Sequence, residues 1–342
     1  MPFTTLEVLA RLHNNRCQKG KTMKKEQIIK GIKIAIACVI AIAIAAELGL
    51  QYASTAGIIT ILSIQNTKRE TIRSARNRAL AFLCALILAA VFFYFLGFTL
   101  FAFAGYLLLF ALLCLYAGWG EAIAMNSVLI THFLTEQSMS TAQILNETGL
   151  FLIGTLMGII VNMHLRRKED LLQNLTEQID IQIKTILSRM AEWLVKDDKS
   201  AYNSDCLIQL QKSLKRARTC AFINYNNALF NNDTYLMDYI RMREQQSVVL
   251  NELYENIKSI TYLPKQANQV AALLESIKLG YHKDNTVEGL LQDLDLIIKD
   301  MKQQELPQSR EEFEARAILF YILKQIHKLL MIKREFINNV QK

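Results

Sequence analysis

Polar side chains that could carry a proton interrupt one apolar part of the chain. The segment EAIAMNSVLITHFL, residues 121–134, begins with Glu121 and contains Asn126, Ser127, Thr131 and His132. In a helix, Glu121 and His132 would share a face and lie about 16 Å apart along the axis. A carboxylate and an imidazole so placed could relay a proton or line a substrate path. Hydrogen bonds to neighbouring helices explain the same residues equally well.

A basic cluster could attract an anion. The segment NTKRETIRSARNR, residues 66–78, carries five Lys or Arg against one Glu, whereas residues 79–165 contain neither Lys nor Arg. This contrast is typical of the cytoplasmic end of a membrane helix. A solvated helix turn is the favoured interpretation for most of the cluster. Arg76 and Arg78 differ because they lie where the next apolar segment begins, and they could bind an anion there.

Six apolar segments are expected to form the helices that carry these residues. Their ranges are 32–50, 53–65, 79–98, 99–117, 122–134 and 148–164. A helix needs about 20 residues to cross the hydrocarbon of a bilayer. The second and fifth segments are short, so they cross only with help from flanking polar residues or a thinner bilayer. Six crossings would place every Lys and Arg cluster, and both chain ends, on the cytoplasmic side.

The two short segments occupy the middle positions of two successive three-helix units. This is the arrangement of an inverted repeat, in which short segments at matching positions mark the substrate site of many transporters. The two units show no residue match, so the hypothesis rests on topology alone. It nominates polar residues of both segments as lining a pathway, namely Ser63, Gln65 and Asn66 with Asn126, Thr131 and His132.

Two further patterns in the apolar half concern packing. GTLMG places Gly154 and Gly158 about one helical turn apart, and small residues at this spacing let helix backbones approach closely. Packing within the chain is favoured over dimerisation for this pair. Aromatic residues gather between residues 92 and 106. We interpret them as a belt at the outer membrane interface in preference to a ring-stacking pocket.

Beyond residue 165 the pattern becomes amphipathic and no β pattern occurs. Apolar residues recur at steps of three and four from Leu171 to Leu194, which predicts a helix that continues the sixth apolar helix. Further helices are expected over 203–230, 234–262, 265–281, 285–303 and 309–339. The sequence thus predicts an all-α protein in three parts. These are an N-terminal extension 1–22, a six-helix transmembrane domain 23–165 and a cytosolic helical domain 166–342.

Several function classes are not expected. The net charge of +8 is concentrated beside the apolar segments, which argues against a nucleic-acid partner. The six Cys and five His are scattered, so we expect no disulfide framework, metal or cofactor. GKT at residues 20–22 lacks the glycine and the strand of a phosphate-binding loop. Because no nucleophile, metalloprotease or kinase motif occurs, the protein is not expected to be an enzyme.

Four stretches of the chain resemble a known family. They are STAGIITILSIQNTKRETIRSARNR, LGFTLFAF, MNSVLITHFLT and LIGTLMGIIVNMHLRRKEDL. These are similar to the aromatic acid exporter family, in particular to its branch with one six-helix unit and a helical C-terminal domain, which is related to fusaric acid resistance transporters. The resemblance extends over nearly the whole chain from Met23. It implies efflux of aromatic carboxylic acids across a bacterial plasma membrane.

On this interpretation we expect a gradient-driven exporter of aromatic acids or similar organic anions. Arg76 and Arg78 would attract the carboxylate, polar groups of the short segments would replace its water, and Glu121 or His132 would couple a proton. Larger relatives carry two such units in one chain, so a homodimer in the lipid bilayer is expected. The alternative is a membrane-anchored sensor or scaffold whose cytosolic helical domain binds a protein partner.

Overall fold

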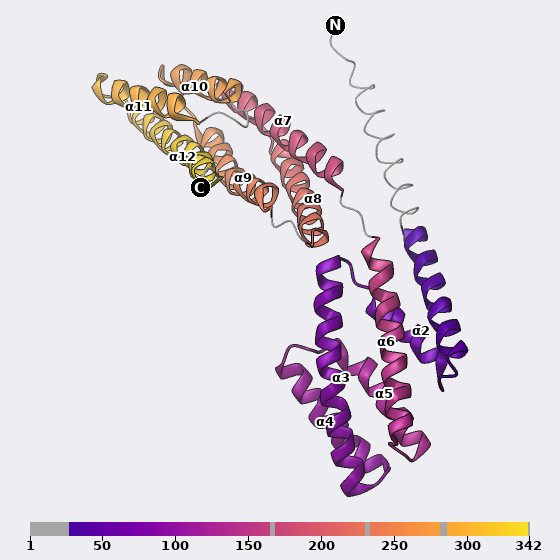
Figure 1. Ribbon diagram of the computed structural model, residues 1–342. Coiled ribbons are helices and arrows are strands. Elements are labelled where there is room, and N and C mark those ends of the chain that lie inside the picture. Colours follow the sequence, from indigo (N-terminus) through magenta and orange to yellow (C-terminus); the bar gives the residue numbers. More distant parts are fainter. Residues whose placement is uncertain (1–26, 165–167, 230–232, 281–285, 341–342) are drawn as a thin grey trace. The chain divides into compact units, whose positions relative to one another are not determined.

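The computed structural model describes residues 27–164, 168–229, 233–280 and 286–340. Within these ranges the chain forms helices and turns without a β-strand, which confirms the prediction of an all-α protein. The predicted extension and its GKT triplet lie outside the described residues. The chain divides into two compact units, shown in Figure 1 and described separately here. Unit 1 comprises residues 1–166 with 226–229, and unit 2 comprises residues 167–225 with 230–342.

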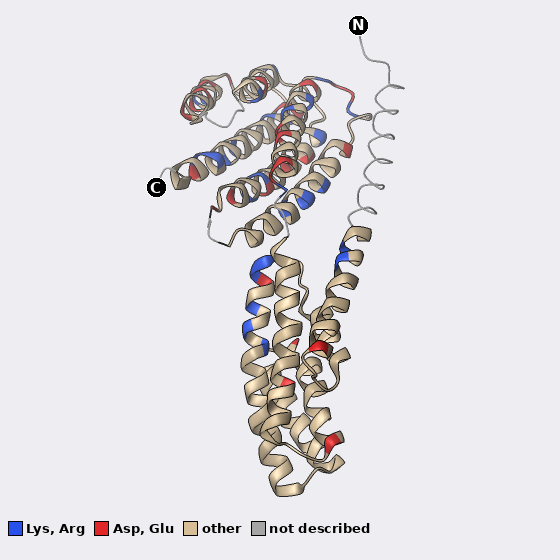
Figure 2. Ribbon diagram, turned by 45° about the vertical axis from the view of Figure 1, so that its right-hand side comes forward, with Lys and Arg blue, Asp and Glu red and all other residues tan. Residues whose placement is uncertain are grey.

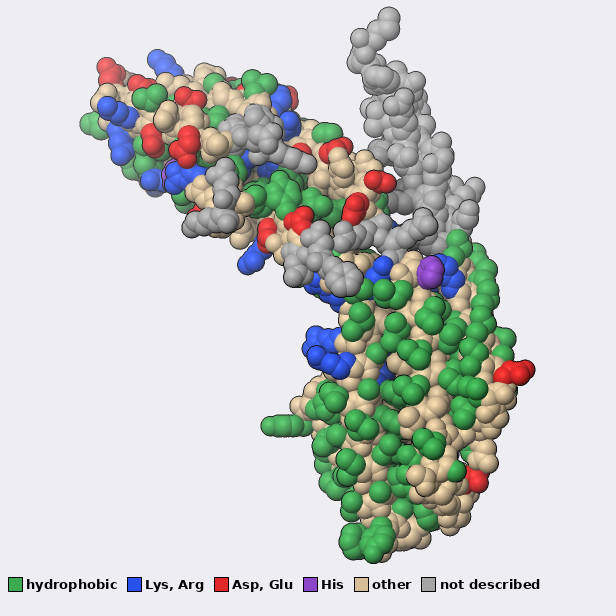
Figure 3. All heavy atoms as spheres, viewed as in Figure 1, with side chains coloured by type: hydrophobic (Ala, Val, Ile, Leu, Met, Phe, Trp, Pro, Cys, Tyr) green, Lys and Arg blue, Asp and Glu red, His purple; other side chains and the backbone are tan. Residues whose placement is uncertain are grey.

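The described part of unit 1 contains a helix for each of the six apolar segments. These are Gln27–Glu47, α2 (Ala53–Ser63), α3 (Lys68–Leu96), α4 (Leu100–Tyr116), α5 (Ala122–Glu136) and α6 (Thr141–Met163). Three of them, Gln27–Glu47, α3 and α6, are long and apolar enough to cross a membrane. The helices α2 and α4 are shorter and apolar, and α5 has 15 residues. Hydrophobic side chains cover much of the visible surface of these helices (Figure 3).

The basic cluster forms the first three turns of α3. Thr67 caps this helix, because its side chain accepts a hydrogen bond from the backbone N–H of Glu70. No Gly or Pro interrupts the 29 residues that follow, which span about 44 Å at 1.5 Å per residue. The basic beginning of α3 lies at the same end of unit 1 as the start of the first described helix, where Lys30 donates to Asn66 (Figure 2).

Close contact between α2 and α6 depends on the two glycines of GTLMG. A Cβ added to Gly154 would lie 2.5 Å from Cβ of Ile59 and 2.7 Å from the backbone oxygen of Ala56. A Cβ added to Gly158 would lie 2.5 Å from Cβ of Ser63. Both glycines therefore serve contacts within the chain. They bring the end of α2, with its polar Ser63, against the neighbouring helix.

Replacing Gly154 with Ala should destabilise unit 1. Overpacking costs about 1–3 kcal/mol because neighbouring backbone has to move. Gly31→Ala is the matched control, since a Cβ at this helical position meets nothing within 4 Å. Ala is favoured over Gly inside a helix by about 0.5–1 kcal/mol. We expect the apparent melting temperature of the detergent-solubilised protein to fall for G154A and to stay or rise for G31A. Equal melting temperatures for the two variants would contradict the packing described here.

Unit 2 is built from six helices in its described part. They are α7 (Glu169–Leu194), α8 (Asp205–Asn227, whose last two residues belong to unit 1), α9 (Tyr235–Ser259), α10 (Ala267–Leu279), α11 (Glu288–Gln303) and α12 (Arg310–Val340). Aliphatic side chains from all six helices form one core. The expected start of the last helix is confirmed, since Ser309 Oγ accepts from the backbone N–H of Glu312 at 3.1 Å.

The prediction that α7 continues the sixth apolar helix is wrong. The helix α6 ends at Met163, and Lys168, with φ −107° and ψ 59°, lies outside the helical region before α7 begins. Glu169 and Asp170 then provide acidic side chains for the first turn of α7, where they favour a new helix N-terminus. The apolar spacing continued across this boundary, but it carried no information about the backbone at Lys168.

A buried arginine connects three helices of unit 2. Arg243 of α9 is 1% exposed, and its Nη2 lies 2.9 Å from Oδ1 of Asp180 in α7. Its guanidinium also donates to the Tyr239 hydroxyl and to Gln246, whose amide donates to the backbone oxygen of Leu329 in α12. Burial raises the pKa of the Tyr239 hydroxyl, which therefore remains protonated and donates to Asp180.

Candidate functional site

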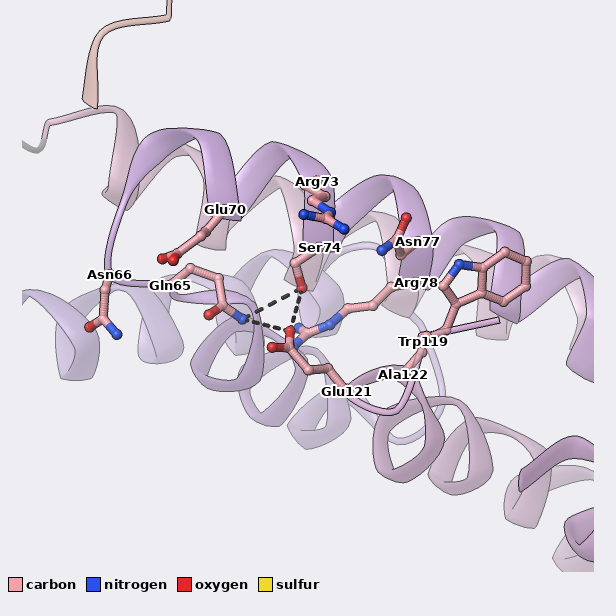
Figure 4. Close-up of a pocket in the computed structure, with 11 residues that line it drawn as sticks. Gln65, Asn66, Glu70, Arg73, Ser74, Asn77, Arg78, Trp119, Glu121 and Ala122 are labelled. Carbon is pink, nitrogen blue, oxygen red and sulfur yellow. Dashed lines mark hydrogen bonds and ion pairs between the residues drawn. The ribbon is translucent and has the colours of Figure 1, made fainter. Parts of the chain in front are cut away.

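A cavity of about 390 Å³ opens at the basic end of unit 1 (Figure 4). Its walls come from the corner between α2 and α3, from the first turns of α3 and from the turn between α4 and α5. The polar lining includes Gln65, Asn66, Glu70, Ser74, Asn77 and Arg78, and the α4–α5 turn adds Trp119 and Glu121. Ligand pockets typically measure about 300–1,000 Å³, so this cavity could hold a small organic molecule.

Helical periodicity explains which residues of α3 reach the cavity. Glu70, Ser74 and Arg78 follow one another at steps of four, so they lie along one side of the helix. Arg76 points away from this side, is exposed and does not line the cavity. The second arginine in the lining is Arg73. The structure therefore separates the two arginines that the sequence analysis grouped together.

Arg78 supplies a buried positive charge to the cavity. Its side chain is 4% exposed, its Nη1 donates to Ser63 Oγ at 3.2 Å, and its Nη2 lies 3.7 Å from Oε2 of Glu121. Its Nε has no hydrogen-bond partner among the described residues. A buried guanidinium with a free donor favours an anion, because a carboxylate fits the fork of N–H groups.

A carboxylate of the chain itself already lies in front of this arginine. Oε2 of Glu121 accepts from Ser74 Oγ at 2.9 Å and from Gln65 Nε2 at 3.1 Å, as the dashed lines of Figure 4 show. The Glu121 side chain is 67% exposed, so it can leave this position without moving a packed core. The donors around Glu121 thus show what the cavity offers to a carboxylate, namely a guanidinium, a hydroxyl and an amide.

An aromatic ring lies next to these donors. Trp119 is half-buried and lines the cavity from the α4–α5 turn. Gly118 precedes it with φ +71°, a left-handed conformation that suits glycine and lets the chain turn sharply there. An indole face beside a carboxylate-binding group could contact the ring of an aromatic acid.

Two buried asparagines fix the backbone around the cavity. Asn126 of α5 donates to the backbone oxygen of Arg78 at 3.4 Å. Asn162 of α6 donates to the backbone oxygen of Gln65 at 3.1 Å and to Thr71 Oγ1 at 2.6 Å. Asn162 therefore ties the α2–α3 corner to α6.

The structure brings together only part of the predicted site. Gln65, Asn66, Arg78 and Glu121 line the cavity, and Ser63 and Asn126 contact Arg78. The other candidates lie elsewhere. Ser127 is half-buried outside the lining, and Thr131 donates to the backbone oxygen of Val128 in its own helix.

His132 belongs to a second polar group near the opposite end of α5. Its Nδ1 lies 2.7 Å from Oε2 of Glu147, and the Tyr52 ring stacks on the imidazole with centroids 4.1 Å apart. Sequence reasoning missed Glu147 and Tyr52, as it missed Trp119 and Ser74 of the cavity. An acidic residue just before an apolar run was the available signal for Glu147. In the described part of the chain, no group of three or more His, Cys, Asp or Glu could hold a metal ion.

Comparison with known proteins places the chain in a family. The model "Aromatic acid exporter family member 1" matches residues 27–165, and the model "Putative aromatic acid exporter C-terminal domain" matches residues 169–334. The chain belongs to the aromatic acid exporter family. This membership and the apolar helices of unit 1 indicate a membrane protein of a transporter family.

One relative and one solved structure illustrate how far this aromatic acid exporter family member resembles others. "Uncharacterized protein YqjA" of Bacillus subtilis (strain 168) is 27% identical over 305 residues, which cover 89% of this chain and 94% of that protein. The solved structure is titled "Crystal structure of putative membrane protein from Clostridium difficile 630". It is 24% identical, covers 48% of this chain and 97% of its own, and has a TM-score of 0.42.

Removing the Asn162 amide should destabilise unit 1. Asn162→Ala leaves the part-buried backbone oxygen of Gln65 and the buried hydroxyl of Thr71 without this donor, and an unsatisfied buried polar group costs about 1–3 kcal/mol. Asn174→Ala is the control, because Asn174 is an exposed residue of α7. We expect a lower apparent melting temperature for N162A than for N174A in a thermal-shift measurement. If both variants melt like the wild type, Asn162 does not hold the corner.

Proposed function

We propose that the protein exports aromatic carboxylic acids, or similar hydrophobic organic anions, across the bacterial plasma membrane. All six helices of unit 1 would cross the bilayer, with both chain ends and unit 2 in the cytoplasm. The observation that carries the proposal is the buried Arg78, which has a free Nε and faces an exchangeable carboxylate. The location of this site among Lys and Arg residues supports cytoplasmic access, because such residues are retained on that side.

The first step of export is an exchange of carboxylates. The substrate carboxylate takes the position of Glu121 in front of Arg78 and accepts from Ser74 and Gln65. Glu121 moves into water, where its charge is solvated. Arg78 stays paired throughout, which matters because an unpaired buried charge is strongly destabilising. Trp119 then provides a face for the aromatic ring, so the site selects an acid with an apolar body.

Movement through unit 1 is proposed to involve the short helices α2 and α5. Both contribute to the surroundings of Arg78, through Ser63 of α2 and Asn126 of α5. A proton gradient would drive the cycle, since no nucleotide-binding motif accompanies the membrane helices. Two copies of the chain would form a homodimer, which supplies the number of helices found in larger relatives.

Binding of an aromatic carboxylate should depend on Arg78 and not on Arg76. The chain has two Trp, so Trp193→Phe leaves Trp119 as the single reporter of the cavity. In this background we expect benzoate to change the Trp119 fluorescence. Losing one partner of a buried charge pair costs about 2–5 kcal/mol, so R78Q should weaken the binding roughly tenfold or more. R76Q, the matched control on the exposed side of α3, should bind like the wild type.

Glu121→Gln gives the opposite expectation. Removing the competing carboxylate should tighten benzoate binding, and R78Q and E121Q should therefore change the Kd in opposite directions. Equal affinities in all four proteins would remove Arg78 from the substrate site.

Efflux from vesicles containing the pure protein then tests transport itself. A protein that neither binds nor moves aromatic acids, and captures a protein partner instead, would be the scaffold.

A further inference from the structure

We propose that His132 and Glu147 form the proton-binding site of this exporter, separate from the anion site at Arg78. This inference rests on the proposed transport function and assigns its coupling to two residues. His132 of α5 is 8% exposed and Glu147 of α6 is 2% exposed. Their side chains meet at 2.7 Å between Nδ1 and Oε2. The pair thus lies inside the helix bundle, where ionisable residues are rare and usually functional.

Glu147 has polar neighbours, but the sequence around it, residues 79–165, contains no Lys or Arg. Its Oε1 accepts from Asn146 Nδ2 at 2.9 Å, and the other oxygen faces His132. A buried carboxylate needs compensation, and the imidazole at 2.7 Å is the group placed to supply it. In the proposed site the pair holds one exchangeable proton.

Changing the proton count of the pair creates a net charge. A second proton gives the pair one positive charge, and loss of the shared proton gives it one negative charge. Either charge is strongly disfavoured while the pair is buried and is tolerated once water enters. Proton exchange is thus linked to opening of this part of unit 1. Such a link is what a gradient-driven cycle requires, since proton uptake and release have to occur in different conformations.

Tyr52 covers the pair and connects it to the exterior of unit 1. Its ring stacks on the imidazole with an interplanar angle of 11°, and its hydroxyl donates to Oε1 of the exposed Glu136 at 2.6 Å. Tyr52 has φ 58° and ψ 38°, a left-handed conformation that a bulky side chain rarely adopts. The turn is held in place next to it, because Gln51 and Asn146 form two hydrogen bonds.

The other groups that face His132 also fit a proton site. Thr55 Oγ1 of α2 lies 3.4 Å from Nε2, so both ring nitrogens have a polar neighbour. Among the described residues, Glu147 from α6 and Tyr52 from the turn before α2 contact the imidazole, and Glu136 of α5 accepts from the Tyr52 hydroxyl. Glu121 is a poorer proton carrier, because its carboxylate is largely exposed and already accepts two hydrogen bonds at the anion site.

The two sites lie near opposite ends of one helix. Glu121 immediately precedes α5, and His132 lies 11 residues further on, about 16 Å along the axis. A shift of α5 would therefore change the surroundings of Arg78 and of the His132–Glu147 pair together. This arrangement couples the anion and the proton through one rigid element while the two ligands remain apart.

Isosteric variants separate the proton site from the anion site. We expect E147Q and H132Q to bind benzoate, read from Trp119 fluorescence in the W193F background, with a Kd within about twofold of the wild type. In vesicles, both variants should lose the stimulation of benzoate flux by a pH gradient and retain exchange of labelled for unlabelled benzoate. The controls are E47Q and H164Q, which change an exposed Glu and an exposed His and should keep the pH stimulation.

A second measurement needs no transport. Nuclear magnetic resonance of labelled histidine follows the protonation of His132, assigned through H132Q, in the full-length protein. We expect E147Q to weaken proton binding at His132, because the variant removes the carboxylate that faces Nδ1, and to leave that of His164 unaltered.

The outcomes distinguish the two proposals. Retained pH stimulation in E147Q and H132Q, or an unchanged His132 titration in E147Q, overturns the proton site while export stands. A wild-type protein that binds benzoate and moves none of it contradicts the export function instead.

Discussion

A charge inside a helix bundle that faces hydrocarbon needs a partner, and this constraint explains most of what unit 1 shows. Lys and Arg are absent from residues 79–165 and gather at one end. Two buried residues of unit 1 that can carry a full charge, Arg78 and Glu147, each face a group that can neutralise them. In the proposed function each partner is exchangeable, since a substrate anion would replace Glu121 and a proton would be added to or removed from the His132–Glu147 pair. Buried charge would then serve to bind the two ligands.

Helix packing makes this pairing possible. Gly154 and Gly158 let α6 approach α2 closely, and Gly158 packs against Ser63, whose hydroxyl accepts from Arg78. Asn162 fixes the corner that carries Gln65. The polar groups of the cavity are therefore held in place by two glycines and an asparagine that do not line the cavity themselves. Their contribution is positional, and it explains why a site of few residues is distributed over segments far apart in the sequence.

Much of the fold could be predicted from hydrophobic patterning, because long apolar runs and amphipathic periodicity depend on the helix repeat alone. The residues of the site were harder to predict from the sequence. Beginning the third apolar segment at residue 79 separated the basic cluster from that helix and hid the periodicity that places Ser74 and Arg78 on the cavity and Arg76 outside it. Had α3 been extended back to Lys68, steps of four would have separated the two arginines. Glu147 was missed because the sixth apolar run was taken to begin one residue later, and its pairing with His132 depends on a tertiary contact that no spacing reveals.

In the proposed topology α3, α4 and α5 all cross the bilayer, so the cavity at Arg78 and the loop after α5 would face opposite sides of the membrane. Single cysteines at Asn77 and Ser138, in a chain whose own cysteines are replaced, test this with a maleimide that cannot cross membranes. We expect labelling of Ser138→Cys in intact cells, and of Asn77→Cys only in inverted vesicles. Labelling of both positions from the same side would contradict it.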